Sequence, residues 1–116
     1  MSIQNIRTGD FIYLLKERGG DLEIIDVRDP GEFNIISVKG SNSIPLGDLS
    51  SRLGEIDWSK DVIFLCRSGV RSRMASEIAA TAGKNVKNLE GGIKGIYSAG
   101  ANEILRISKN KIGDYF

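Results

Sequence analysis

The stretch that decides the fold is 62-VIFLCRSGVRSRMASEIAA-80. Its first four residues are apolar and run directly into Cys66, as is typical of a short strand covered on both faces of a sheet. A stripe of apolar residues at helical spacing follows and ends at Gly83. The stretch therefore predicts a strand, a loop at 66–72 and a helix that starts near Arg73, with Cys66 at the carboxyl end of the strand.

The rest of the chain repeats this alternation of apolar strands and helical stripes. Such alternation predicts an α/β fold, a mostly parallel sheet with helices on both faces. Ligands bind to such sheets at the carboxyl ends of the strands, which is where Cys66 lies. Besides 62–65, the expected strands are 22–27, 41–45 and 85–89, and the other expected helices are 8–18, 46–56 and one from about Ile93.

Length and charge describe an ordinary single domain. We place that domain at residues 1–102 and a C-terminal extension at 103–116, where Tyr115-Phe116 can dock on the body or contact a partner. Sixteen basic and fifteen acidic residues leave a net charge of +1, which gives no reason to expect nucleic acid or a membrane surface as a partner. The N-terminal residues lack the pattern of a signal peptide, so we expect a cytoplasmic location.

The count of cysteines and histidines limits the possible chemistry. Cys66 is the only cysteine and the chain has no histidine. An intramolecular disulfide, a Cys–His dyad and a Ser–His–Asp triad are therefore excluded. A metal site would lack soft ligands, and we expect no metal and no cofactor. Cys66 is then either a buried strand residue or a nucleophile.

The loop after Cys66 favours the nucleophile. Loop N–H groups and a helix N-terminus present partial positive charge, which lowers the pKa of a nearby thiol. Arg67 and Arg71 add full charges and can each hold an oxyanion with two N–H groups. Gly69 provides conformational freedom, and Ser72 is a suitable N-cap for the helix. The loop therefore predicts a thiolate surrounded by donors for an anionic substrate.

The segment Cys66-Arg67-Ser68-Gly69-Val70-Arg71 resembles the active-site loop of the single-domain rhodaneses, which are thiosulfate sulfurtransferases. The resemblance extends over about residues 5–100. It includes the family's Asp-x-Arg segment and the segment after the catalytic helix. These further matches are 24-IIDVRDPGEF-33, Gly40, Ile44-Pro45 and 88-NLEGGI-93.

The resemblance implies a five-stranded parallel sheet and a double displacement at Cys66. The thiolate would take the outer sulfur of a small anionic donor such as thiosulfate and pass it to cyanide, a thiol or a sulfur-accepting protein. Asp26, Arg28 and Ser72 would support the loop. The residues expected to bind the donor are Arg67, Ser68, Gly69, Val70 and Arg71.

Three departures and three alternatives accompany this resemblance. The family's usual Gly-His is Ile36-Ser37 here, and the following Ile-x-Gly-Ala is Val38-Lys39-Gly40-Ser41. A tryptophan common after the Gly91-Gly92 pair is replaced by Ile96. A related phosphatase would have five residues between its cysteine and arginine, whereas four separate Cys66 from Arg71. A persulfide carrier that serves a partner protein, and an inactive interaction module of the same fold, are the other two alternatives.

Overall fold

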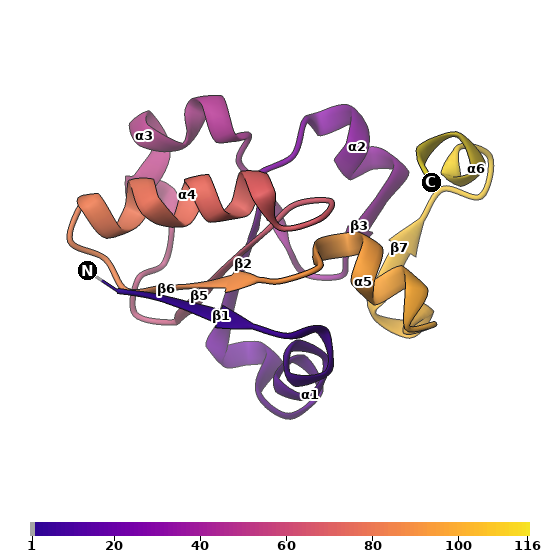
Figure 1. The fold of residues 1–116 in the computed structure, drawn as a ribbon, viewed down its shortest axis with the longest axis horizontal. Coiled ribbons are helices and arrows are strands. Elements are labelled where there is room, and N and C mark those ends of the chain that lie inside the picture. Colours follow the sequence, from indigo (N-terminus) through magenta and orange to yellow (C-terminus); the bar gives the residue numbers. More distant parts are fainter. Residues whose placement is uncertain (1) are drawn as a thin grey trace.

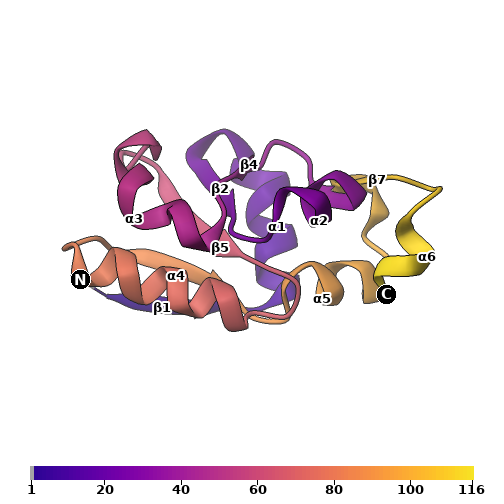
Figure 2. The same cartoon turned by 90° about the horizontal axis from the view of Figure 1, so that it is seen from above.

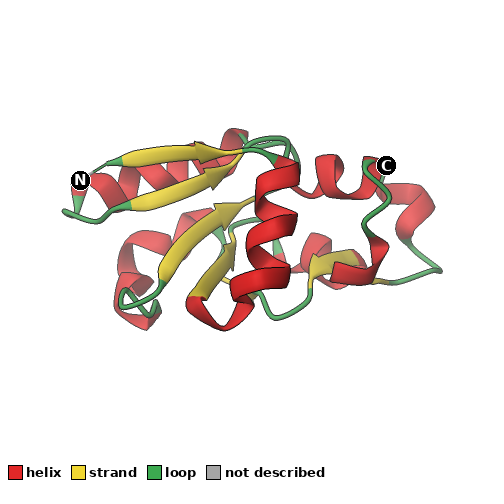
Figure 3. Ribbon diagram, turned by 90° about the horizontal axis from the view of Figure 1, so that it is seen from below, coloured by secondary structure: helices red, strands yellow, loops and turns green. Residues whose placement is uncertain are grey.

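Strand β5 (Asp61–Leu65) lies at the centre of a five-stranded sheet in the computed structural model, which describes residues 2–116. All neighbouring strands are parallel, so the predicted α/β fold class is confirmed (Figure 1). Figure 3, seen from the side of helix α1, shows the strands running in one direction. The order across the sheet is β1 (Ile3–Ile6), β6 (Val86–Leu89), β5, β2 (Leu22–Asp26) and β4 (Asn42–Ser43).

Helices cover both faces of this sheet (Figures 1 and 2). Alternate residues of β5 supply the two cores: Ile63 and Leu65 belong to one, Val62 and Phe64 to the other. This double burial is the reason that the strand reads as a continuous apolar run. Helices α1 (Thr8–Arg18) and α5 (Gly92–Ser98) pack on the first face, and α3 (Leu49–Arg52) and α4 (Val70–Thr81) pack on the second.

Two elements differ from the expectation from apolar periodicity. The expected helix at 46–56 is divided into a 3₁₀ turn at Leu46–Asp48, the short helix α3 and a second 3₁₀ turn at Leu53–Glu55. A glycine lies in each 3₁₀ turn, and glycine is a poor helix former. Strand β1 was not predicted by its own pattern, because it is an edge strand with three of its four residues exposed.

The C-terminal residues pair with the body through a small second sheet. Strand β7 (Leu105–Ile107) runs antiparallel to β3 (Ile36–Val38), which follows helix α2 (Pro30–Ile35). Ser37, at the position of the family's usual histidine, is fully buried and accepts a hydrogen bond from Nη2 of Arg106 at 2.8 Å. Helix α6 (Ile112–Tyr115) then packs close to α2, which brings the chain end towards the Cys66 loop.

The start of helix α5 holds the backbone after Cys66. The N–H of Ile93 donates to the carbonyl oxygen of Cys66 at 2.9 Å, and the N–H of Lys94 donates to that of Arg67 at 3.0 Å. This approach requires glycine at position 92, where φ is +54° and a Cβ would overlap both carbonyl groups. The turn that the Gly-Gly pair predicts is therefore also the contact that fixes the loop.

Replacing Gly92 by alanine should destabilise the protein strongly. The positive φ and the overlap with the Cys66 and Arg67 carbonyls should together lower the free energy of unfolding by at least about 2 kcal/mol. Urea denaturation measures this difference. Gly54→Ala is the matched control, because nothing lies within 4 Å of its added Cβ. Equal effects of the two substitutions would contradict the proposed contact.

Candidate active site

Cys66 lies between the end of β5 and the first turn of α4, and the whole residue is only 1% exposed. The N–H of Gly69 donates to its Sγ at 3.0 Å. Gly69 has φ of +107°, and a Cβ there would lie 3.4 Å from the carbonyl oxygen of Leu89. A residue with a side chain would be strained in this conformation, so glycine allows the turn that directs the amide at the sulfur.

Ser72 is not the N-cap that the sequence predicted. Helix α4 begins at Val70 and Gly69 holds the N-cap position, because its positive φ lets the chain enter the helix earlier. Ser72 is buried in the first turn, where its hydroxyl donates to Oδ1 of Asn88 at 2.6 Å. Asn88 in turn donates to Asn5 at 3.2 Å. The serine therefore ties α4 to β6 and β1.

Two opposing effects act on the Cys66 thiol. Burial raises the pKa, but hydrogen bonds from the Ser72 hydroxyl and from the backbone N–H groups of Ser72, Gly69 and Ser68 outweigh it, so the net shift is downward. The Ser72 hydroxyl has one proton and cannot serve Sγ and Asn88 at the same time. The backbone N–H groups are therefore the permanent stabilisers of the thiolate.

Arg71 is paired with a carboxylate that lies 39 residues away in the sequence. Its Nη1 and Nη2 donate to Oε1 and Oε2 of Glu32 at 2.6 and 3.1 Å. The Tyr115 hydroxyl donates to the same carboxylate at 2.8 Å. The hydrogen bonds from Arg71 are the main reason that the pKa of Glu32 falls to about 2, and burial opposes this shift. Arg71 thus places a fixed charge beside Cys66, while its two terminal nitrogens are already hydrogen-bonded to Glu32.

Asp26 and Arg28 form a completely buried ion pair, with 2.7 Å between Oδ2 of Asp26 and Nη2 of Arg28. Burial lowers the pKa of Arg28, but the hydrogen bonds and charge of Asp26 outweigh it and the net shift is upward. Arg28 also donates to the carbonyl oxygen of Ile36 in β3 and, at 2.9 Å, to the hydroxyl of Tyr115. The pair thus holds β3 and α6, and Tyr115 connects it with Glu32 and with Arg67 of the loop.

Arg67 contacts aromatic rings at the end of the chain. Its guanidinium carbon lies 5.5 Å from the ring centroid of Tyr115 and 5.4 Å from that of Phe116. In the part of the chain that the structure describes, this guanidinium has no hydrogen-bond or ion-pair partner. Arg67 is therefore the arginine of the loop whose charge no carboxylate neutralises.

A cavity of about 320 Å³ opens beside the loop. Ser68, Gly69 and Val70, three of the predicted donor-binding residues, line it together with Met74 and Gly91. Val70 and Met74, which are 67% and 45% exposed, form an apolar part of the lining, whereas Arg73, Glu77 and Glu90 form a charged part. Among residues 2–116, no three metal-ligating side chains come together, and no helix is long and apolar enough to cross a membrane.

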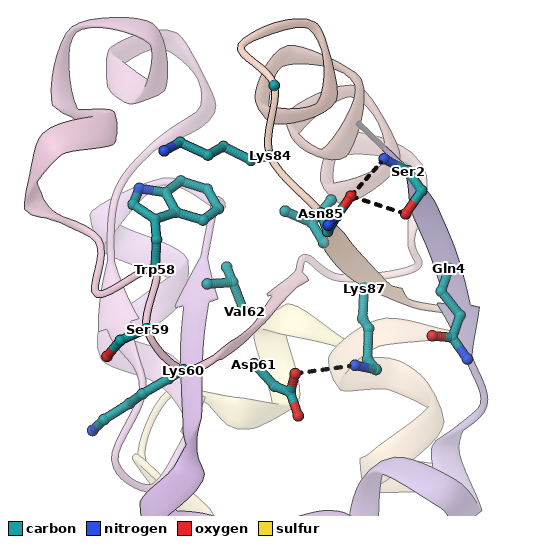
Figure 4. Close-up of a pocket in the computed structure, with 12 residues that line it drawn as sticks. Ser2, Gln4, Trp58, Ser59, Lys60, Asp61, Val62, Lys84, Asn85 and Lys87 are labelled. Atoms are coloured by element: carbon teal, nitrogen blue, oxygen red, sulfur yellow. Dashed lines mark hydrogen bonds and ion pairs between the residues drawn. The ribbon is translucent and has the colours of Figure 1, made fainter.

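A second pocket, of about 480 Å³, lies at the other end of the sheet (Figure 4). Its walls include Trp58, Lys87 and Asp61, and Lys87 pairs with Asp61 at 3.5 Å. Asp61 starts β5, whereas Cys66 follows its last residue, which separates the pocket from the sulfur by roughly 16 Å of strand. This pocket is therefore unconnected with the Cys66 loop.

Glu32 and Tyr115 are the two residues of this site that the sequence did not predict as site residues. Glu32 lies in the segment 24–33 that resembles the family, but nothing in the sequence connects it with Arg71. Tyr115 lies in the C-terminal extension, whose position depends on the pairing of β7 with β3. Neither contact is local, so no pattern within one element could have revealed it.

Glu32→Gln should change how stability depends on pH. The folded-state pKa of about 2 lies below the ordinary 4.5, so the stabilisation by the carboxylate is complete above pH 4.5 and is lost as the pH falls towards 2. Because solvent screens the partly exposed Arg71, we expect the carboxylate to contribute about 1–2 kcal/mol to the free energy of unfolding. Chemical denaturation from pH 7 to pH 2 measures it. Parallel curves for the wild type and the variant would contradict the pairing.

Comparison with known proteins places this site in a family. Residues 11–99 match the rhodanese-like domain family. A protein from Allochromatium vinosum named "Sulfurtransferase" is 34% identical over 74 residues, which cover 63% of this chain and 69% of that protein. The crystal structure of a rhodanese-related protein from Thermoplasma volcanium is 28% identical, with a TM-score of 0.74 over 84% of this chain and 93% of that one.

Another relative shows that the same domain occurs within longer proteins. The "HTH-type transcriptional regulator Rv0324" of Mycobacterium tuberculosis is 32% identical over 82 residues. The match covers 69% of this chain but only 36% of that protein. The shared part is therefore the domain that carries the Cys66 loop. The family match over most of the chain and the parallel sheet with Cys66 at its carboxyl edge show that this chain belongs to the rhodanese-like domain family.

Proposed function

We propose that the protein is a sulfurtransferase that moves sulfane sulfur from a donor such as thiosulfate to a thiophilic acceptor through a persulfide on Cys66. The observation that carries this proposal is the hydrogen bond from the Gly69 amide to Sγ of Cys66 at 3.0 Å. A thiolate stabilised by amides can act as a nucleophile without a neighbouring base. The Allochromatium vinosum relative, which is named a sulfurtransferase, supports sulfur transfer as the general reaction.

In the first step, the Cys66 thiolate attacks the outer sulfur of thiosulfate. A bond forms between Sγ and that sulfur, the S–S bond of the donor breaks, and sulfite leaves with the bonding electron pair. The enzyme then carries a cysteine persulfide with one negative charge on its outer sulfur. The N–H groups of the loop that now face Sγ are suited to hold this charge.

In the second step, a nucleophilic acceptor such as cyanide or a thiolate attacks the outer sulfur. The S–S bond of the persulfide breaks, and the electron pair returns to Sγ as thiolate. The cycle needs no cofactor, because each half-reaction exchanges one S–S bond for another bond to the same sulfur. The products of the two steps are sulfite and a thiocyanate or a persulfide.

Within the loop, the two arginines provide positive charge and the residues between them provide the shape of the binding site. Arg67 attracts the anionic donor, and Arg71, fixed by Glu32, keeps a positive charge beside the thiolate. The backbone N–H groups of Ser68 and Gly69 face Sγ and are suited to hold the negative charge of the transferred sulfur. The loop has four residues between Cys66 and Arg71, whereas the loop of the related phosphatases has five. The shorter loop encloses a smaller site, which favours a sulfur atom over a phosphate group.

A persulfide carrier is the second candidate function. The loop chemistry would be the same, but the acceptor would be a thiol of a partner protein. The apolar side chains of Val70 and Met74, 67% and 45% exposed beside the loop, favour this candidate. Exposed apolar patches of this kind commonly mark interaction sites.

The proposal predicts turnover that depends on one thiol. With thiosulfate and cyanide, the wild-type protein should produce thiocyanate, and Cys66→Ser should abolish it, because an alkoxide does not form under these conditions. The ferric thiocyanate colour reaction measures the product. Thermal unfolding by circular dichroism controls for the fold of the variant. Undiminished thiocyanate formation by a folded Cys66→Ser protein would disprove the mechanism.

A further inference from the structure

Helix α6 lies outside the residues that match the family, yet the rings of Tyr115 and Phe116 contact Arg67 of the Cys66 loop. The Tyr115 hydroxyl also donates to Glu32, the carboxylate that pairs with Arg71. We propose that Tyr115 and Phe116 are positioning residues that hold Arg67 as the group that recognises the negative charge of the sulfur donor. This inference rests on the proposed function of the loop and assigns to the C-terminal extension a part in selecting the donor.

Arg71 is poorly placed for that recognition. Glu32 occupies one N–H group on each of its two terminal nitrogens, and the negative charge of Glu32 offsets the attraction of Arg71 for an incoming anion. An incoming dianion would meet the Glu32 carboxylate along with the guanidinium. To bind the donor with a fork of two N–H groups, Arg71 would have to give up bonds of 2.6 and 3.1 Å. Its role is therefore confined to the field that it exerts on the thiolate.

Arg67 has the opposite properties. Its charge has no carboxylate partner among the described residues, and the rings of Tyr115 and Phe116 lie about equally far from the guanidinium carbon, at 5.5 and 5.4 Å. Contacts with ring faces leave the in-plane N–H groups of a guanidinium available as donors. A guanidinium that is already held by rings also loses less conformational freedom when it binds an anion.

The aromatic rings are themselves fixed by the elements that hold the loop. Phe116 stacks on Tyr97 of α5, with ring centroids 4.8 Å apart and an angle of 16° between the rings. The Tyr115 hydroxyl is bound between Arg28 and Glu32 at 2.9 and 2.8 Å. Helix α5 also binds the carbonyl oxygen of Arg67 through the N–H of Lys94. The backbone and the side chain of Arg67 are therefore positioned by the same helix.

The test compares how fast Cys66 reacts with a charged and with a neutral alkylating agent. Iodoacetate carries one negative charge and iodoacetamide carries none, while both reach the same sulfur. The wild-type ratio of the two rates measures the attraction that Arg67 exerts on an anion. Phe116→Leu should lower this ratio by roughly two- to fivefold, the factor that corresponds to the loss of one cation–π contact at a partly exposed site. The rate with iodoacetamide should stay unchanged.

Four further variants make the assignment specific. Arg67→Gln should lower the ratio at least as much, and Phe116→Leu should then have no additional effect in the double variant. Glu32→Gln should raise the ratio, because it releases the charge of Arg71. Tyr13→Leu is the matched control, since Tyr13 is 65% exposed on α1 and removing it should leave the ratio unchanged.

The result separates this inference from the proposed function. An unchanged ratio in Phe116→Leu, or an equal change in both alkylation rates, would overturn the positioning role. Additive effects of Phe116→Leu and Arg67→Gln would overturn it as well. Failure of sulfur transfer itself would instead appear as an absence of thiocyanate with the wild-type protein, while the alkylation ratio can still be measured on the thiol.

Discussion

The two hydrogen bonds from α5 to the carbonyl oxygens of Cys66 and Arg67 are the constraint on which the rest of the site depends. With those carbonyls directed at α5, the following amides can turn the other way, and the Gly69 N–H meets Sγ at 3.0 Å. Two glycines with positive φ make this possible: Gly92 admits the approach of α5, and Gly69 starts α4. The loop is thereby held between the N-termini of two helices.

Around this loop, two of three arginines are paired with carboxylates. Arg28 is buried against Asp26 and Arg71 is paired with Glu32, whereas Arg67 has no carboxylate partner among the described residues. A buried ion pair adds little net stability, but breaking one by removing a single partner costs about 3–5 kcal/mol. Arg28 therefore acts as a fixed point that joins β2, β3 and α6. The charge that remains available for an anionic substrate is that of Arg67, the residue directly after Cys66.

The sequence was sufficient to predict the elements that local patterns determine. The mainly apolar runs at 22–27 and 62–65 correspond to β2 and β5, because both faces of these strands are buried and most of their residues are apolar. The composition also limited the chemistry to one thiol. The sequence predicts a start near Arg73 for the helix after Cys66, because Ser72 is a favourable N-cap residue. The helix in fact begins at Val70, because Gly69 adopts a left-handed conformation at the N-cap.

The remaining features depend on contacts between distant parts of the chain. Strand β1 lies at the edge of the sheet with three of its four residues exposed, so its short sequence gives no clear strand pattern. The Glu32–Arg71 pair joins helices α2 and α4, and the position of Tyr115 depends on the pairing of β7 with β3. These contacts determine which arginine lacks a carboxylate partner, so the electrostatics of the site could be derived only from the structure. The hypothesis that Cys66 is the nucleophile, by contrast, follows from the sequence.

The formation of a persulfide on Cys66 is the central claim, and intact mass spectrometry tests it most directly. The protein is incubated with thiosulfate, freed of small molecules and measured without reducing agent, and a peptide digest then locates any added mass. We expect the peptide that contains Cys66 to gain the mass of one sulfur atom, and we expect cyanide to remove this sulfur. An unchanged mass in a protein whose Cys66 thiol still reacts with iodoacetamide would contradict it.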